Sequence, residues 1–170
     1  MLISMIKSIL NHLSAPSFRI YFALQQVILL EKARFTQGQI FARYSIPTEL
    51  RLFGSFSGFT SLVSSLIRQG LNSYPVASAN RLVFVTADYS ANELTVRITD
   101  GGSGLRYQTK SYLRESSQYL PDQIKSLNQL EKTMKYQFRG EITIHNFTTR
   151  GTQVTLKFPV PSDSQTRDKS

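Results

Sequence analysis

The sequence contains no cysteine and only two histidines among its 170 residues. Without cysteine the chain has neither a disulfide framework nor a thiolate metal site, and two histidines are too few for a histidine-rich metal site. Its apolar runs are far shorter than the roughly 20 residues of a membrane-spanning helix. Residues 1–13 also lack a small-residue cleavage site after a long apolar core. These absences predict a cytoplasmic protein without a membrane span.

Acidic residues are also scarce, with 11 Asp and Glu against 20 Lys and Arg, so the formal net charge is +9. A basic balance of this size is compatible with a polyanionic partner such as nucleic acid, anionic lipid or a nucleotide phosphate. The basic residues of the first half are scattered rather than clustered, which is typical of a solvated surface. The charge therefore favours no single class of partner.

The length and the 41% hydrophobic content suit one globular domain that buries its core without disulfides. Apolar residues repeat at helical spacing over residues 1–13, and Pro16 ends this pattern. Residues 161–170 are polar, which is typical of a disordered tail. The predicted organisation is an amphipathic segment over residues 1–16, one domain over residues 18–160, and the tail.

Three segments within the domain predict helices, over residues 18–32, 59–74 and 122–138. Residues 59–74 place apolar side chains at i, i+3, i+4 and i+7, so one side of this helix faces the core. Its opposite stripe carries Ser65, Gln69 and Asn72.

Short strands are predicted over residues 40–45, 50–53, 81–87, 93–99, 141–146 and 153–159, with a loop over residues 54–58. Residues 93–99 alternate apolar and polar side chains, and residues 89–92 turn the chain between two strands of a hairpin. One face of the sheet is therefore expected to be buried and the other wet. The sequence predicts a two-layer α/β sandwich, with a mainly antiparallel, mixed sheet and helices on one face.

The most informative motif is Asp100-Gly101-Gly102-Ser103-Gly104 at the end of the alternating strand. Glycines at this density let the backbone approach a ligand closely, and the carboxylate can accept a hydrogen bond from an exocyclic amine. An Asp-Gly pair after a strand is also typical of a simple turn. The fragment alone is compatible with both interpretations.

This motif resembles the adenine-binding box of the GHKL superfamily, which has the Bergerat fold. The superfamily joins sensor histidine kinases, gyrase-type topoisomerases, ninety-kilodalton heat-shock chaperones and mismatch-repair ATPases. Other segments occur in the family's order: residues 50–55 resemble the strand before the Asn-containing box, residues 59–74 stand at that box, residues 139–142 resemble the kinase Gly-Gly-Glu-Ile entry, and residues 150–159 resemble the closing Gly-Thr strand. The resemblance covers residues 18–160.

By this resemblance, Asp100 would accept the adenine amine, and Thr152 would support Asp100 or a bridging water. Gly102 and Gly104 would let the ring approach and hinge a lid. Gln69 and Asn72 are the remaining candidate nucleotide-binding residues. Gln69 stands where the family's magnesium-binding Asn is expected, but its longer side chain misplaces the oxygen for the magnesium shell.

The phosphate-binding part departs further from the family. The glycines that would present backbone amides to phosphate align with residues 125–128, which contain none. The bases that could attract phosphate instead are Arg106, Lys110, Arg114 and Lys125, and these residues suit a solvated lid face equally well.

No catalytic residue is assigned, because Ser65 replaces the Glu of the hydrolysing branches and has no adjacent base. His12 lacks the acid that follows a phosphoacceptor histidine in kinases. The main hypothesis is a pseudokinase: a histidine-kinase-like domain with an eroded site, which binds ATP or ADP without a proper magnesium site. It would act in two-component-type signalling by contacting a response regulator or a His-bearing signalling protein.

Two further interpretations of the function stay open. The chain could be an active catalytic domain of a divergent sensor histidine kinase, or a basic nucleic-acid-binding module that uses the open sheet face with Phe84 or Tyr89. The apolar stripe of residues 1–13 precedes the domain where kinases of this family join their dimerising helices. It therefore predicts a homodimer, the alternative being that this segment folds back onto its own domain.

Overall fold

The computed structural model describes residues 16–36, 38–75, 77–102 and 122–160, and of residues 122–127 it describes the backbone. The predictions for residues 1–13 and 161–170 therefore lie outside the described residues. None of the described helices is long and apolar enough to cross a membrane. The elements follow in the order β1 (Ser17–Arg19), α2 (Ile20–Arg34), β2 (Gly38–Ser45), β3 (Arg51–Phe53), α3 (Phe56–Asn72), β4 (Arg81–Ser90), β5 (Glu93–Asp100), α5 (Asp122–Gln137), β6 (Glu141–Asn146) and β7 (Thr152–Pro159).

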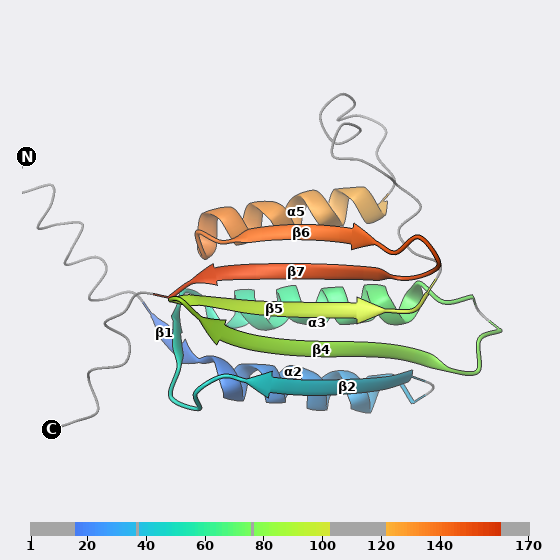
Figure 1. Ribbon diagram of the computed structural model, residues 1–170, viewed down its shortest axis with the longest axis horizontal. Coiled ribbons are helices and arrows are strands. Elements are labelled where there is room, and N and C mark those ends of the chain that lie inside the picture. The colour runs from blue at the N-terminus through green and yellow to red at the C-terminus, as the bar shows by residue number, and fades with distance from the viewer. Residues whose placement is uncertain (1–15, 37, 76, 103–121, 161–170) are drawn as a thin grey trace, which may run out of the picture.

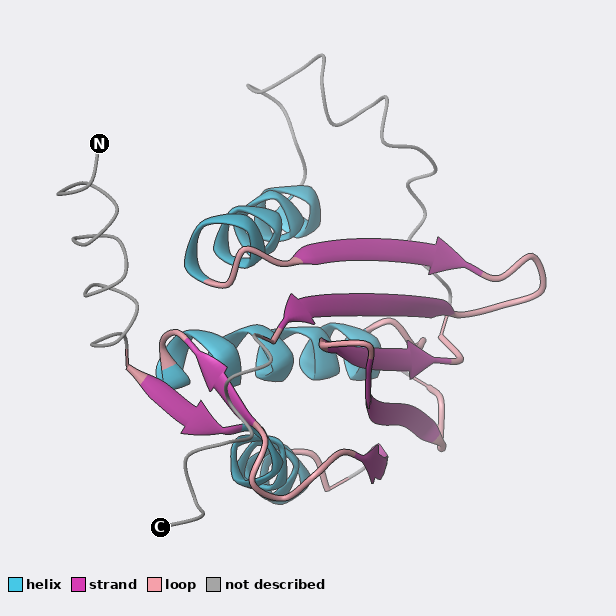
Figure 2. Cartoon of the chain, turned by 60° about the vertical axis from the view of Figure 1, so that its left-hand side comes forward, coloured by secondary structure: helices cyan, strands magenta, loops and turns pink. Residues whose placement is uncertain are grey.

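The main sheet has the strand order β2-β4-β5-β7-β6. β2 and β4 are parallel, and the other neighbouring strands are antiparallel. Figure 1 shows α2, α3 and α5 on one side of this sheet, and Figure 2 shows the same arrangement from a second direction. β1 and β3 form a separate two-stranded sheet. The predicted two-layer α/β sandwich with a mainly antiparallel sheet is confirmed.

The apolar periodicity of the sequence accounts for the core between the two layers. In β5 the alternating residues Leu94, Val96 and Ile98 are all buried, as predicted. In α3 the buried apolar side chains recur at helical spacing, at Phe59, Leu62, Val63, Leu66, Ile67 and Leu71.

Two of the three described helices, α2 and α3, begin at different residues from those predicted. α3 begins at Phe56, inside the predicted loop, because the Ser55 hydroxyl caps the helix by accepting a hydrogen bond from the Gly58 amide at 3.1 Å. α2 begins at Ile20 rather than at residue 18, since residues 17–19 form β1 instead. A three-residue strand has no periodicity of its own, so the pattern could not separate it from the helix.

The hairpin of β4 and β5 turns at Ala91 and Asn92, whose φ angles of 50° and 60° are typical of a two-residue type I′ turn. β4 therefore extends to Ser90, beyond the predicted end at residue 87. Tyr89 packs against the core, whereas Phe84 is exposed on the opposite face. The prediction that Tyr89 belongs to the open sheet face was wrong. Successive side chains of a strand point to opposite faces, and Tyr89 is an odd number of residues from Phe84 in β4.

A buried carboxylate joins α2 to α3. Glu31 is 0% exposed, and the Arg68 guanidinium donates to it through Nε at 2.9 Å and Nη2 at 2.8 Å. The Ser64 hydroxyl and Arg34 Nη1, at 3.2 Å, also donate to Glu31. The polar side of α3 is therefore fixed against α2 by an ion pair with several hydrogen bonds.

Candidate functional site

Asp100 ends β5 and pairs in register with Thr152 at the start of β7. The two strands thus bring together residues that are far apart in the sequence, as the family resemblance implied. Both side chains are buried, and Asp100 is only 9% exposed. Asp100 therefore does not lie in an open cleft, because the end of α3 covers it.

The Asp100 carboxylate is already engaged by the protein. Its Oδ1 accepts hydrogen bonds from the Ser73 hydroxyl and from the Gly102 amide, each at 2.9 Å. Ser73 Oγ also lies 2.7 Å from the Gly70 carbonyl oxygen, so its single hydrogen has two acceptors within reach. Burial raises the pKa of Asp100, and the hydrogen bonds from Gly102, Ser73 and the Thr152 backbone oppose this rise.

Glycines surround Asp100 because the protein itself occupies the space of their missing side chains. A Cβ on Gly102 would clash with Ser73 Oγ, and a Cβ on Gly151 would clash with the Asp100 carbonyl oxygen. Gly151 also has a φ of +101°, which L side chains rarely adopt. These contacts explain the glycines without any ligand.

Two site residues were not predicted from the sequence, Ser73 and Tyr74. The Tyr74 hydroxyl donates to the Leu82 carbonyl oxygen at 2.7 Å and accepts from the Gly101 amide at 2.8 Å, which fixes the turn after Asp100. Ser73 comes one helical turn after Gln69, so the continuation of the polar stripe was the available signal.

The second side of Asp100 is formed by the segment before β7. The Thr152 hydroxyl donates to Asn146 Oδ1 at 3.1 Å, and Arg150 Nε donates to the Gly102 carbonyl oxygen at 3.3 Å. Of the predicted site, the structure thus brings Asp100, Gly102 and Thr152 together. Gly104 lies outside the described residues.

The predicted contacts on α3 are less well defined. Gln69 is half-buried, and its Nε2 is buried without a hydrogen-bond partner among the described residues. Asn72 is exposed at the end of the helix. The described residues contain no group of three or more His, Cys, Asp or Glu side chains that could hold a metal ion. The roles of Gln69 and Asn72 stay predictions.

The backbone of α5 shows where the segment aligned with the family's phosphate-binding glycines lies in the helix. α5 begins at Asp122, so the amides of residues 126–128 lie beyond its first four residues, where amides bond to carbonyls one turn earlier. The bases at Arg106, Lys110 and Arg114 lie outside the described residues, as does the side chain of Lys125.

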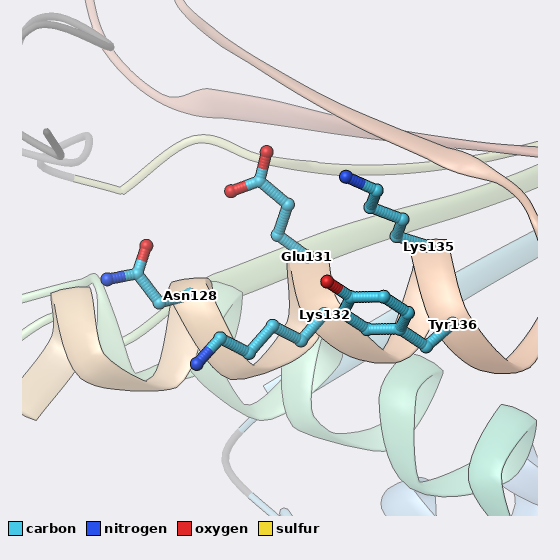
Figure 3. Close-up of a pocket in the computed structure, with 5 residues that line it drawn as sticks. All are labelled: Asn128, Glu131, Lys132, Lys135 and Tyr136. Atoms are coloured by element: carbon cyan, nitrogen blue, oxygen red, sulfur yellow. The ribbon is translucent and has the colours of Figure 1, made fainter.

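A hollow of about 240 Å³ lies on α5 itself and is lined by Asn128, Glu131, Lys132, Lys135 and Tyr136 (Figure 3). These residues recur at helical spacing on one stripe, with Lys135 Nζ 5.7 Å from the centre of the Tyr136 ring. None of the predicted nucleotide-binding residues lines it.

No protein family matches the sequence, and no curated protein is similar to it in sequence. Solved structures share its fold. The catalytic domain of the histidine kinase ThkA has a TM-score of 0.70 at 14% identity, over 89% of this chain and 99% of that chain. The ATP-binding domain of PrrB from Mycobacterium tuberculosis has a TM-score of 0.66 at 17% identity, over 87% of this chain and 98% of that chain.

Two larger structures contain the same fold. The complex of ThkA with the response regulator TrrA gives a TM-score of 0.65 at 16% identity, over 98% of this chain and 48% of that chain. Full-length ShkA in complex with AMPPNP gives 0.64 at 14% identity, over 87% of this chain and 32% of that chain. The chain therefore has the fold of histidine-kinase ATP-binding domains, which the sequence motifs predicted.

Proposed function

We propose that this chain is a histidine-kinase-like ATP-binding domain with an eroded site for phosphate and magnesium, which acts in two-component-type signalling mainly through a partner protein. The observation that carries the proposal is the contact between Ser73 and Asp100. The Ser73 hydroxyl donates to one oxygen of the carboxylate that the resemblance assigns to the adenine amine, and Ser73 Oγ occupies the space that a Cβ on Gly102 would need.

The adenine half of the site fits a nucleotide only in part. Asp100 Oδ1 already has two donors, so an adenine amine must use the other oxygen or displace the Ser73 hydroxyl. Displacement leaves that hydroxyl its second acceptor, the Gly70 carbonyl oxygen. Weak adenine binding is therefore compatible with these contacts.

The phosphate half fits less well. Gln69 is a poor magnesium ligand, and Ser65, at the other Asn-box position, is exposed and offers no carboxamide. At α5, most amides of the aligned segment are within the helical hydrogen-bond pattern rather than at its N-terminus. These departures support a domain that does not transfer phosphate.

The partner follows by analogy with ThkA, which was solved in complex with a response regulator. We assign a response regulator or a His-bearing signalling protein as the partner of this chain too. The proposed homodimer through residues 1–13 involves a segment outside the described residues.

Calorimetric titration with ATP and ADP, with and without magnesium, tests the proposal. We expect no saturable micromolar binding of ATP, and any weak binding should not depend on magnesium. Saturable micromolar binding that requires magnesium would overturn the eroded site and support an active kinase domain, as AMPPNP binding by ShkA illustrates.

A matched pair of variants tests the role of Ser73. Ser73→Ala removes one hydrogen bond from Asp100 and should raise nucleotide affinity about fivefold, the equivalent of one hydrogen bond. The control is Ser65→Ala, which changes an exposed serine on α3, the helix that Ser73 follows, and should leave affinity unchanged. Equal effects of the two variants would show that Ser73 does not compete with adenine.

A further inference from the structure

One edge of the main sheet is open. β2 pairs with β4 along all its eight residues, and no described strand pairs with its other edge. Figure 1 shows β2 as the outermost strand of the sheet, opposite β6. Edge strands of this length present unpaired backbone donors and acceptors, and proteins usually protect them with a proline, a bulge or inward charges. β2 contains no proline, and Arg43 is its single charged residue.

Phe41, on the outward-facing side of β2, forms an exposed aromatic pair with Phe84 of β4. Phe41 and Phe84 are 49% and 47% exposed, and their rings stack with centroids 5.3 Å apart and an interplanar angle of 19°. About half of each side chain stays in contact with water. Covering this apolar surface with a partner would be favourable. The pair lies at the strand edge, where an added strand would cover Phe41.

The charges on this face identify the chemistry of the occupant. Arg97 pairs with Asp88 at 2.6 Å and Lys157 pairs with Glu93 at 3.0 Å, so these cations are neutralised. Arg43, two residues from Phe41, is exposed and has no acidic partner among the described residues. One unmatched cation beside paired ones suits a single carboxylate better than the repeated phosphates of a nucleic acid, which need several free cations.

We propose that the open edge of β2 binds an extended acidic segment of a partner protein by strand addition. The segment places an aromatic side chain beside Phe41 and a carboxylate beside Arg43, two residues apart on one face of the added strand. The net charge of +9 favours an acidic partner over a second copy of this chain. This inference rests on the proposed function, in which the domain acts through protein contacts, and names the surface for that contact.

Fluorescence anisotropy with synthetic peptides tests the inference without nucleotide. The probes are fluorescein-labelled eight-residue threonine peptides in which phenylalanine and glutamate stand two residues apart, in both orders. We expect saturable binding that Phe41→Ser weakens about tenfold. Arg43→Glu should weaken it similarly, and replacing the peptide glutamate by lysine should restore binding to Arg43→Glu. Phe22→Ser is the control, because Phe22 is 53% exposed but lies on α2.

Each other outcome overturns the inference. Absence of saturable binding to the unchanged protein, or equal loss in Phe22→Ser, excludes the edge as the site. A dimer in sedimentation that Phe41→Ser dissociates assigns the edge to a second copy, and single-stranded oligonucleotide binding lost in Phe41→Ser assigns it to nucleic acid. The calorimetric nucleotide titration is independent of these peptides, so failure of the inference and failure of the proposed function are distinguishable.

Discussion

Removal of the Arg68 guanidinium should destabilise the protein strongly, although Arg68 is 42% exposed. Its partner Glu31 is fully buried and would lose two charge-assisted hydrogen bonds. Breaking one side of a buried ion pair typically costs about 3–5 kcal/mol. We expect Arg68→Ala to be at the lower end, about 3 kcal/mol, because Ser64 and Arg34 still donate to Glu31. In a domain of this size the melting temperature should fall by about 6–12 °C.

Thermal and urea unfolding followed by circular dichroism measure this effect, with two comparison variants. Arg34→Ala removes the longer and more exposed contact and should cost less than about 1 kcal/mol. Glu31→Leu combined with Arg68→Ala leaves no buried charge, so the double variant should recover most of the lost stability. A loss below about 1 kcal/mol in Arg68→Ala, or equal losses in both arginine variants, would refute the argument.

Three further outcomes are expected. Asp100→Asn should fold and gain melting temperature relative to the unchanged protein as pH rises from about 3 to 7. Burial raises the pKa of Asp100 in the folded protein, so the unchanged protein loses stability as pH rises above the pKa of this carboxyl in the unfolded chain. A difference in melting temperature between the two proteins that becomes smaller as pH rises would contradict this. Gly151→Ala should cost more than about 2 kcal/mol in urea unfolding. Gly58→Ala should cost less, because its nearest contact is the end of the flexible Gln137 side chain and its φ is not positive; equal losses of stability would exclude backbone strain as the explanation. Ile6→Asp with Leu10→Asp should convert a sedimenting dimer into a folded monomer, and an unchanged dimer mass would exclude residues 1–13 as the interface.

The fold was largely predictable because its main signals are periodic. The helical spacing of residues 59–74 and the alternation of residues 93–99 each describe one buried face, and the structure places both faces in the core. β1 escaped prediction because its three residues are held by pairing with β3, a contact between distant segments. The boundaries of α3 depended on the Ser55 cap, which the loop prediction did not use.

The sequence predicted which motif residues form the candidate site, but not which residues contact them. Asp100 and Thr152 were predicted by resemblance, and the antiparallel register of β5 and β7 brings them together. The polar stripe of α3 could have indicated Ser73 as a polar position, but not its hydrogen bond to Asp100, which joins residues 27 positions apart. The burial of Asp100 was missed for the same reason, since the end of α3 provides it.

Gly102 and Gly151 are both required by packing that involves no nucleotide. Gly102 accommodates Ser73, and Gly151 accommodates the end of β5, so larger residues at either position would disrupt the fold. Gln69 differs, because its buried Nε2 has no partner among the described residues, and an unsatisfied buried donor costs about 1–3 kcal/mol. The packing of the protein explains Gly102 and Gly151 and gives no reason for Gln69. A requirement for ligand would therefore be revealed by substitutions at Gln69 rather than within the motif that first indicated the family.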